Sequence, residues 1–415
     1  MAETSIAWGG WEPSVRDDPF PLFADVQAQC PVHRVRLADG PEAWLVVGHD
    51  AARQALSDAR LSKDMVAALD GDRDVVAEGL PGPAFSRHML NVDPPDHTRL
   101  RKLVAPAFMP SRMTALEPSI QQTADELLSR LEAEGPDAVV DLVAGFAHPL
   151  PFGVIGELLG VPAVDRSMLH EWFQTLLAPW AGNPPPEAVA ASDGIVGYLE
   201  DLVDAKRHAP GDDLVSVLLS AREDGDRLSH QELLSSLFQL IVAGYDTTTS
   251  LIGNGVVALL DHPDQLRVLQ TDVSMVPLAV EELVRFTAPV PHATFRMTSE
   301  TVTVGGVDIP GHRQVLVCIA AANRDPTTFP DADRLDIRRP RRPHLGFGHG
   351  IHFCLGAPLA RLEARVAFSV LLGRFPQIRL AVPRADLAWT HGDGLVLRGL
   401  GSLPVILGPG NVLGQ

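Results

Sequence analysis

One long segment, from Ser229 to about Asp261, constrains this chain more than any other feature of its sequence. Ser229 followed three residues later by Glu232 forms a capping box, which predicts the start of a helix at that point. Apolar residues then recur with helical spacing and are interrupted only by small residues. A helix of this length rises about 1.5 Å per residue and would cross a whole domain, so we expect its middle to lie deep inside the protein.

The rest of the pattern predicts a mainly α protein with small β-sheets. Near the N-terminus, VHRVRL and AWLVVG alternate like two short strands, and GPE between them is a turn signal. We expect a helix-rich body over about 50–225 and another helix at about 276–286. TVTVGGVDIP and QVLVCIA predict a hairpin pair. Residues 323–350 are expected to be irregular, and a final helix is expected at about 357–374.

Length and composition describe a globular chain. Its 415 residues are 46% apolar and 21% charged, a mixture that can bury a sizeable core. We expect one domain over 1–415, with frayed ends at about 1–10 and 408–415. The net charge of −18 argues against a nucleic acid or an anionic membrane surface as partner. No apolar run reaches membrane-spanning length and no signal-peptide pattern opens the chain, which indicates a cytoplasmic protein. We also expect the protein to be a monomer.

The chain has three cysteines, too few and too scattered for a disulfide framework. Cys30 precedes a proline and Cys318 lies in an apolar run, so we expect both to be inert buried thiols. Cys354 differs because it lies between Gly350 and Gly356, just before a helix that a proline can start. The partial positive charge of a helix N-terminus lowers a thiol's pKa and stabilises the thiolate, which is the form that binds metal.

Two alternatives stay open for this loop. It can be a plain helix-entry loop with a buried cysteine, or a zinc site built from His349, His352 and Cys354, with His344 as the only further candidate nearby. Zinc would need a fourth ligand, and neither of the other two cysteines has a partner at zinc-ligand spacing. The loop alone therefore indicates a metal-binding thiolate and favours haem over zinc.

The segment FGHGIHFCLG resembles the cysteine-ligand loop of the cytochrome P-450 superfamily, whose pattern is F-G-x-G-x-H-x-C-x-G. Every fixed position is matched. The resemblance implies a haem b group with Cys354 as its axial thiolate and metal ligand. It also implies that Phe347 shields the sulfur, that His352 contacts a haem propionate, and that Gly348 and Gly356 let the backbone approach the flat cofactor.

The middle of the long helix resembles the family's oxygen-activation segment, A-G-x-D/E-T-T. Without the resemblance, Asp246 and Thr247 would be an ordinary helical acid and a threonine that bonds backbone, although an acid buried in a dry interior is costly. The resemblance implies that these two residues relay and hold the protons needed to break the O–O bond. Ala243 and Gly244 have small side chains, which would let oxygen and substrate lie against the helix.

Glu282 and Arg285 match the family's E-x-x-R, and their i, i+3 spacing puts both on one helix face. A solvated surface pair would look the same. The resemblance adds an arginine from the irregular segment that locks the scaffold of the cysteine loop, and we expect this arginine to be Arg334. Leu335 stands where the family commonly has phenylalanine.

Three further cationic residues are candidates for the haem propionates. His97 and Arg101 stand i, i+4 apart and face the same way, which charge alone would assign to an exposed face. The resemblance implies that they hold the propionates together with Arg296, because buried carboxylates need charge-assisted partners.

The resemblance covers nearly the whole chain, with its motifs in the family's order, and is closest to soluble bacterial members. It implies a monooxygenase that inserts one oxygen atom of O2 into a hydrophobic small molecule. The segments flanking the long helix resemble actinobacterial members that act on macrolides, other natural products and xenobiotics. The expected substrate contacts are mostly apolar, and they are Phe85, Met89, Leu90, Ile241, Val242, Val290, His292, Ala293, Thr294, Leu395 and Val396.

The chain has no flavin or iron–sulfur segment, so an external donor must supply electrons, and a ferredoxin with an NAD(P)H-dependent reductase is expected. The basic run of Arg338, Arg339, Arg341 and Arg342 is either a solvated linker or the docking patch for this acidic donor. Two other functions stay open. A peroxide-driven enzyme would more typically lack the acid–alcohol pair, and a non-catalytic haem-thiolate sensor or carrier would need no proton relay.

Overall fold

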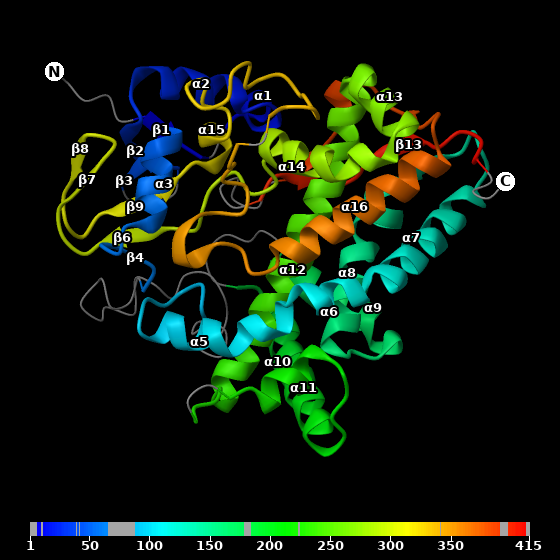
Figure 1. Ribbon diagram of the computed structural model, residues 1–415, viewed down its shortest axis with the longest axis horizontal. Coiled ribbons are helices and arrows are strands. Elements are labelled where there is room, and N and C mark those ends of the chain that lie inside the picture. The colour runs from blue at the N-terminus through cyan, green and yellow to red at the C-terminus, as the bar shows by residue number, and fades with distance from the viewer. Residues whose placement is uncertain are drawn as a thin grey trace. The chain divides into compact units, whose positions relative to one another are not determined.

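The computed structural model describes residues 6–9, 11–38, 40, 42–64, 88–177, 184–222, 225–340, 342–390 and 397–411. The chain has the mainly helical fold with small sheets that its sequence predicts (Figure 1). Its contacts divide it into two compact units. Unit 1 comprises Met1–Leu61, Glu117–Leu150 and Thr247–Gln415, and unit 2 comprises Ser62–Leu116 and Pro151–Asp246.

The largest sheet has six strands in the order β1-β2-β3-β9-β6-β4. β2 and β3 are antiparallel, with Val35 opposite Ala43, which confirms the two strands predicted near the N-terminus. β9 runs parallel to β3 and antiparallel to β6. The strands are β1 (Ile6–Trp8), β2 (Val32–Leu37), β3 (Glu42–Val46), β4 (Leu61–Ser62), β6 (Arg296–Thr298) and β9 (Gln314–Val317).

Alternate residues of this sheet enter two separate hydrophobic clusters, because successive side chains of a strand point to opposite faces. Val46 of β3 joins the cluster that contains the alanines and leucine of α3 (His49–Ser57). Leu45 joins the other cluster, with Trp8, with Phe23 from α2 (Phe20–Gln29) and with α15 (Ile319–Ala322). The sheet is therefore buried on both faces within unit 1.

The predicted pairing of TVTVGGVDIP with QVLVCIA is wrong. β7 (Val302–Val304) and β8 (Val307–Ile309) pair with each other, while QVLV forms β9 inside the large sheet. Gly305 and Gly306 have φ values of +55° and +80°, which is the backbone of a two-residue hairpin turn that only glycine-like residues favour. The turn signal inside the first segment thus makes a hairpin by itself.

The long helix is present as α12 (His230–Asp261), with 32 residues that span about 48 Å. The capping box that predicts its start is formed: the Ser229 N–H donates to Glu232 Oε2 at 2.8 Å, and the Glu232 N–H donates to Ser229 Oγ at 3.2 Å. The helix belongs to unit 2 up to Asp246 and to unit 1 from Thr247 onward.

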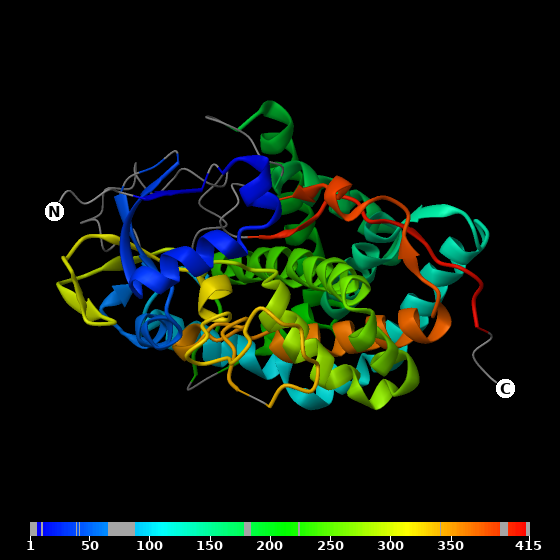
Figure 2. The same ribbon diagram turned by 90° about the horizontal axis from the view of Figure 1, so that it is seen from above.

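Helices also form the rest of unit 1. α16 starts and ends as predicted, and it packs against α14 and α7, beside which it lies in both views (Figures 1 and 2). The elements are α1 (Pro13–Asp17), α7 (Glu117–Glu132), β5 (Val139–Asp141), the π-helical turn η3 (Val143–Ala147), α13 (Pro263–Thr271), η5 (Val273–Met275), α14 (Val276–Thr287), η6 (Gly350–His352), α16 (Ala357–Arg374), β10 (Arg379–Leu380), η7 (Arg384–Asp386), β11 (Trp389–Thr390), β12 (Gly399–Leu400) and β13 (Pro404–Ile406).

Unit 2 is built of helices and short 3₁₀ turns around the first half of α12. Its elements are α5 (Asp96–Val104), η2 (Ala105–Phe108), α6 (Pro110–Ala115), α8 (Pro149–Leu159), which begins in unit 1, η4 (Ala163–Asp165), α9 (Arg166–Leu177), α10 (Pro186–His208) and α11 (Leu214–Ser220). Of the helices in the described ranges, none combines the length and the apolarity that a membrane crossing requires.

Candidate functional site

Cys354 lies in a tight loop of unit 1, between η6 and the start of α16. The Cys354 N–H donates to the carbonyl of Phe347 at 2.9 Å and closes the loop. Gly348 and Gly350 both have a φ of +73°, in the left-handed region that favours glycine. A Cβ added to Gly350 would lie 2.7 Å from the carbonyl oxygen of Leu56, so the loop needs glycine there for space as well as for backbone angle.

The three cysteines differ in accessibility. Cys354 is exposed, Cys30 is partly exposed rather than buried as expected, and Cys318 is fully buried. Burial raises the pKa of the Cys318 thiol to about 12, which keeps it protonated and inert as predicted. A Cβ added to Gly356 would lie 3.9 Å from the Cys354 sulfur, so the sulfur has a glycine as neighbour. An accessible cysteine thiol next to glycines is a suitable axial ligand for haem iron.

The zinc alternative for the cysteine loop gains no support. In the part of the chain that the structure describes, no three His, Cys, Asp or Glu side chains are grouped so that they could hold a metal ion. His344, the fourth candidate for such a site, instead contacts Glu281, with its Nε2 3.2 Å from Oε2 of the carboxylate.

The E-x-x-R pair is a buried ion pair and not a surface one. Arg285 donates from Nε to Glu282 Oε2 and from Nη2 to Glu282 Oε1, both at 2.8 Å, and the two side chains are 2% and 5% exposed. Arg339 adds a third bond, from Nε to Glu282 Oε1 at 3.1 Å. Arg339 therefore occupies the place that we expected for Arg334.

Arg334 takes part only through its backbone. Its carbonyl accepts from Arg339 Nη2 at 2.8 Å, while the residue itself is exposed. Leu335, the departure from the family pattern, is buried with 1% exposure, so its smaller side chain still fills the core there. The Arg334 side chain points outward to solvent. The chain contacts Glu282 Oε1 at two later residues: Asp336 donates from its backbone N–H, and Arg339 donates from its side chain.

The middle of α12 carries a half-buried acid. Burial raises the pKa of Asp246 to about 6, and a hydrogen bond with the Tyr245 side chain opposes that rise. Tyr245 itself is buried within unit 2, with its ring edge-on to Phe152 at 5.3 Å between ring centroids. Ala243 is exposed although it lies at the centre of a 32-residue helix, and Thr247 is half-buried. The middle of the helix thus has an exposed small residue and two half-buried polar residues.

Sequence reasoning missed one buried acid, Glu363 of α16. It is 1% exposed, and burial raises the pKa of its carboxyl well above its ordinary value, while a hydrogen bond with the Thr248 side chain opposes the rise. Thr248 is also buried and directly follows Thr247 on α12. An acid within the apolar positions of the last helix was the signal in the sequence that could have drawn attention to this contact.

The residues expected at the haem propionates are divided between the two units. Arg296 is 5% exposed in β6 of unit 1 and donates from Nη1 to the Leu61 carbonyl at 3.2 Å, and His352 lies half-buried in η6. His97 is 2% exposed, and Arg101 lies half-buried one turn later on α5 of unit 2. A buried arginine and a buried histidine fit partners for buried carboxylates.

The expected substrate contacts need one correction. His292 is 1% exposed, and its Nε2 accepts a hydrogen bond from the Trp8 indole at 3.0 Å. It also packs edge-on against Phe23, inside the sheet cluster, so it does not belong in the substrate set. Met89 and Ile241 are buried, while Leu90, Val242, Val290, Ala293 and Thr294 are half-buried. Phe85, Leu395 and Val396 lie outside the described residues.

The basic run before the cysteine loop is not a uniform surface patch. Arg338 and Arg342 are exposed, and Arg341 lies outside the described residues. Arg339 is held by Glu282 with only 11% of its side chain exposed, so neither a docking patch nor a solvated linker, the two alternatives for this run, describes it.

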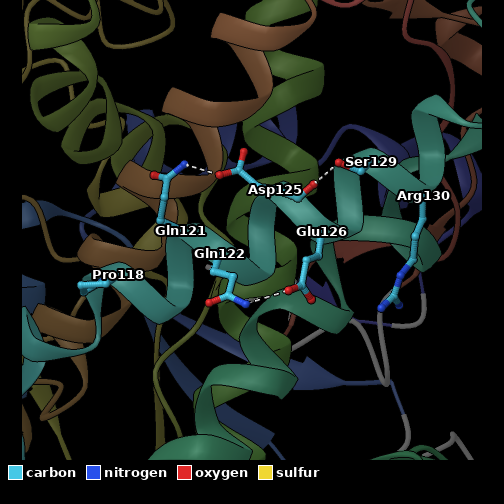
Figure 3. Close-up of a pocket in the computed structure, with 7 residues that line it drawn as sticks. All are labelled: Pro118, Gln121, Gln122, Asp125, Glu126, Ser129 and Arg130. Atoms are coloured by element: carbon cyan, nitrogen blue, oxygen red, sulfur yellow. Dashed lines mark hydrogen bonds between the residues drawn. The ribbon is translucent and has the colours of Figure 1, made fainter. Parts of the chain in front are cut away.

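A surface depression on α7 carries none of the predicted site residues (Figure 3). Its polar side chains bond along their own helix: Gln121 to Asp125 at 3.0 Å, Gln122 to Glu126 at 2.9 Å, and Ser129 to the Asp125 carbonyl at 2.7 Å. These are the i, i+4 contacts of an exposed helix face, so the depression is structural.

Comparison with known proteins places the chain in a family. The profile of the cytochrome P-450 family matches residues 163–379. Cytochrome P-450 107B1 of Saccharopolyspora erythraea is 47% identical over 90% of this chain and 92% of its own length. The 6-deoxyerythronolide B hydroxylase of the same organism is 44% identical over 94% and 96% of the two chains.

A solved structure agrees with these relatives. The bacillaene polyketide synthase cytochrome P-450 PksS of Bacillus subtilis superimposes with a TM-score of 0.88 at 40% identity, covering 96% of this chain and 98% of that one. The chain therefore belongs to the cytochrome P-450 family and is a P-450 monooxygenase.

Proposed function

We propose that this monooxygenase binds haem through the Cys354 thiolate and oxidises a hydrophobic polyketide-type molecule. The observation that carries the first part is the loop itself. Cys354 is exposed within a glycine cradle, and the loop is closed by the bond from its N–H to Phe347. Bound there, haem would supply the reductive activation of dioxygen.

The residues of α12 manage protons in this proposal. Asp246, with a pKa of about 6, changes its protonation state close to neutral pH, which suits a group that passes protons on. Thr247, the next residue, offers a hydroxyl that can both accept and donate a hydrogen bond. Glu363 of α16 forms an acid–hydroxyl contact with Thr248, the residue that follows Thr247 on α12.

Cationic residues hold the propionates of the cofactor in this proposal. Arg296 and His97 are buried, and Arg101 and His352 are half-buried. Charge-assisted hydrogen bonds from such groups offset the cost of burying two carboxylates.

The substrate class rests on the relatives and on the expected contacts. One relative is named for the hydroxylation of 6-deoxyerythronolide B, and PksS is named with a polyketide synthase. Apart from Thr294, the described residues that remain in the predicted set are apolar: Met89, Leu90, Ile241, Val242, Val290 and Ala293. A macrolide-like or polyketide-like compound suits such a lining.

A ferredoxin, reduced by an NAD(P)H-dependent reductase, supplies the electrons in this proposal. Arg338 and Arg342 are the described residues of the basic run that remain exposed for an acidic donor. Screening by salt makes such docking dependent on ionic strength.

The deciding experiment is the absorption spectrum of the reduced, carbon-monoxide-bound protein. Thiolate ligation gives a far red-shifted Soret band, and Cys354→Ala should abolish it, whereas Cys318→Ala should leave it in place. An imidazole-type band in the unmodified protein would refute Cys354 as the ligand.

The same preparation tests the substrate and the electron source. Polyketide macrolactones should shift the haem from low spin to high spin, and turnover should require ferredoxin, reductase and NAD(P)H. Turnover with hydrogen peroxide alone would indicate the peroxide-driven enzyme, and binding without any turnover would indicate a sensor or carrier.

A further inference from the structure

Two adjacent glutamates of α14, Glu281 and Glu282, bind different sets of partners. Glu282 binds Arg285 and Arg339, as described above. Glu281 instead binds Arg361 of α16 in a two-pronged ion pair, with Arg361 Nε to Oε1 at 2.6 Å and Nη2 to Oε2 at 2.9 Å. Neighbouring residues on a helix point about 100° apart, so Glu281 contacts a different element from the one that Glu282 contacts. Glu281 therefore links α14 to the helix that follows the cysteine loop.

His344 is the second partner of Glu281. The Gly346 N–H donates to His344 Nδ1 at 3.1 Å, so the ring proton is on Nε2. That Nε2 lies 3.2 Å from Glu281 Oε2 and donates to it. Gly346 approaches α14 so closely that an added Cβ would lie 2.3 Å from a Val284 methyl carbon. The segment that leads into the cysteine loop is thus held directly against α14.

The carboxylate of Glu281 is stable as an anion at this place. Burial raises the pKa of Glu281, but the hydrogen bonds from His344 and Arg361 and the charge of Arg361 outweigh burial and bring the pKa to about 2. The guanidinium of Arg361 is therefore fixed by an ionised partner in a planar, two-bond geometry, which a lysine could not reproduce.

Arg361 also covers the ring of Phe347. Its guanidinium carbon lies 4.4 Å from the ring centroid, within the range of a cation–π contact. Phe347 is the residue whose carbonyl accepts the Cys354 N–H at 2.9 Å. A continuous set of contacts thus runs from Glu281 through Arg361 and Phe347 to the backbone of the cysteine.

We propose that Arg361, held by Glu281, is a positioning residue that keeps Phe347 in place beside Cys354 and so preserves the thiolate as the iron's ligand. This inference rests on the proposed function of Cys354. It assigns to the Arg361–Glu281 pair a role that differs from that of the buried Glu282 network. Glu282 holds the irregular segment, and Glu281 holds the ring at the cysteine loop.

The chain offers a closely matched control on the same helix. Arg365 lies one turn after Arg361 on α16 and pairs with Glu117 of α7 at 2.7 Å. The two arginine side chains are similarly exposed, 37% for Arg361 and 34% for Arg365. The contacts that the structure shows for Arg365 do not include a ring of the cysteine loop. Arg361→Ala and Arg365→Ala therefore remove the same kind of partly exposed ion pair, but only the first removes the contact with Phe347.

The test uses the haem-loaded protein and follows the thiolate-type Soret band of its reduced carbon-monoxide complex under mild heating. We expect Arg361→Ala to speed the loss of this band about three- to five-fold, the effect of losing one exposed cation–π contact. Arg365→Ala should change the rate less than about two-fold, as a surface ion pair would. Arg361→Lys and Glu281→Gln should lie between Arg361→Ala and the unmodified protein.

The outcomes separate the two proposals. If the unmodified protein shows no thiolate-type band, the proposed function of Cys354 fails. If it shows the band and the two alanine variants lose it at the same rate, the positioning role of Arg361 is overturned. Urea unfolding of both variants, measured by far-ultraviolet circular dichroism, shows whether a rate difference reflects general destabilisation. A difference in unfolding as large as the difference in band loss would also overturn the proposal.

Discussion

Arg339 donates from Nε to Oε1 of Glu282 across 3.1 Å, with 11% and 5% of the two side chains exposed. The same carboxylate takes both bonds of Arg285 and the backbone N–H of Asp336. Arg339 also donates to the carbonyls of Pro330, Asp331 and Arg334. One side chain therefore joins α14 to the turn that precedes the cysteine loop.

We predict that Arg339→Ala destabilises the protein and that Arg334→Ala does not. Removing Arg339 takes a charged donor from the buried carboxylate of Glu282 and leaves three backbone carbonyls without this partner, and we expect a loss of about 2–3 kcal/mol in the free energy of unfolding. Arg334 contributes only its carbonyl, which alanine retains, so we expect a change within about 0.5 kcal/mol. Urea unfolding of both variants measures the difference. Equal destabilisation by the two substitutions would contradict the assignment of Arg339.

The parts of this fold that the sequence predicts are those set by local pattern. α12 follows from its capping box and periodicity, α16 from a proline start, and the Glu282–Arg285 pair from helical spacing. The choice between Arg334 and Arg339 depends on how an irregular turn directs each side chain, and no periodicity reports this.

Contacts between distant segments were beyond prediction for a similar reason. Strand β9 pairs in parallel with β3, which is far away in the chain. The glycine turn between β7 and β8 predicts only a local hairpin, so it could not indicate that β9 pairs with β3. The contact of Glu363 with Thr248 joins two helices, each of which looks complete by itself. The burial of His292 under Trp8 likewise depends on where the N-terminal strand packs.

The raised pKa of Asp246 predicts a dependence of stability on pH. Its pKa is about 6 in the folded protein against an ordinary 3.8. Between these values the unfolded chain loses the proton while the folded chain keeps it, so the free energy of unfolding falls as pH rises from about 4 to 6. Because Asp246 is only half-buried, we expect a fall of about 1–3 kcal/mol from this group. In Asp246→Asn this part of the dependence should be missing.

A second variant checks the cause of the shift. Tyr245→Phe keeps the buried ring but removes the hydrogen bond that lowers the pKa of Asp246. The window in which stability falls should therefore extend to higher pH. Urea unfolding across pH 4–8 measures all three proteins, and parallel curves for Asp246→Asn and the unmodified protein would show that burial does not raise this pKa.

Thr247 should control how well reductant use is coupled to product. We expect Thr247→Ala to lower the ratio of product formed to NAD(P)H consumed by about ten-fold or more, because a positioned proton-transfer group is lost, and to release peroxide instead. Thr249→Ala is the control, because it removes the same kind of side chain from a buried position about 200° around α12 from Thr247. Product, peroxide and NAD(P)H are measured with a compound that shifts the haem spin state and has no hydroxyl near the oxidised position. Equal coupling in both variants would argue against a relay through Thr247.

Two glycines of the cysteine loop separate backbone strain from lack of space. Gly348 and Gly350 share a φ of +73°, so alanine at either position costs about 1–2 kcal/mol for the left-handed conformation. A Cβ at position 348 would meet nothing closer than the His352 carbonyl oxygen at 3.8 Å, whereas one at position 350 would lie 2.7 Å from the Leu56 carbonyl oxygen. Backbone oxygen cannot move aside as a side chain can, so Gly350→Ala should lower the free energy of unfolding of the haem-free protein by at least about 1 kcal/mol more than Gly348→Ala does. Urea unfolding of the two variants tests this. A larger effect of Gly348→Ala would mean that the loop does not pack against Leu56 as the structure shows.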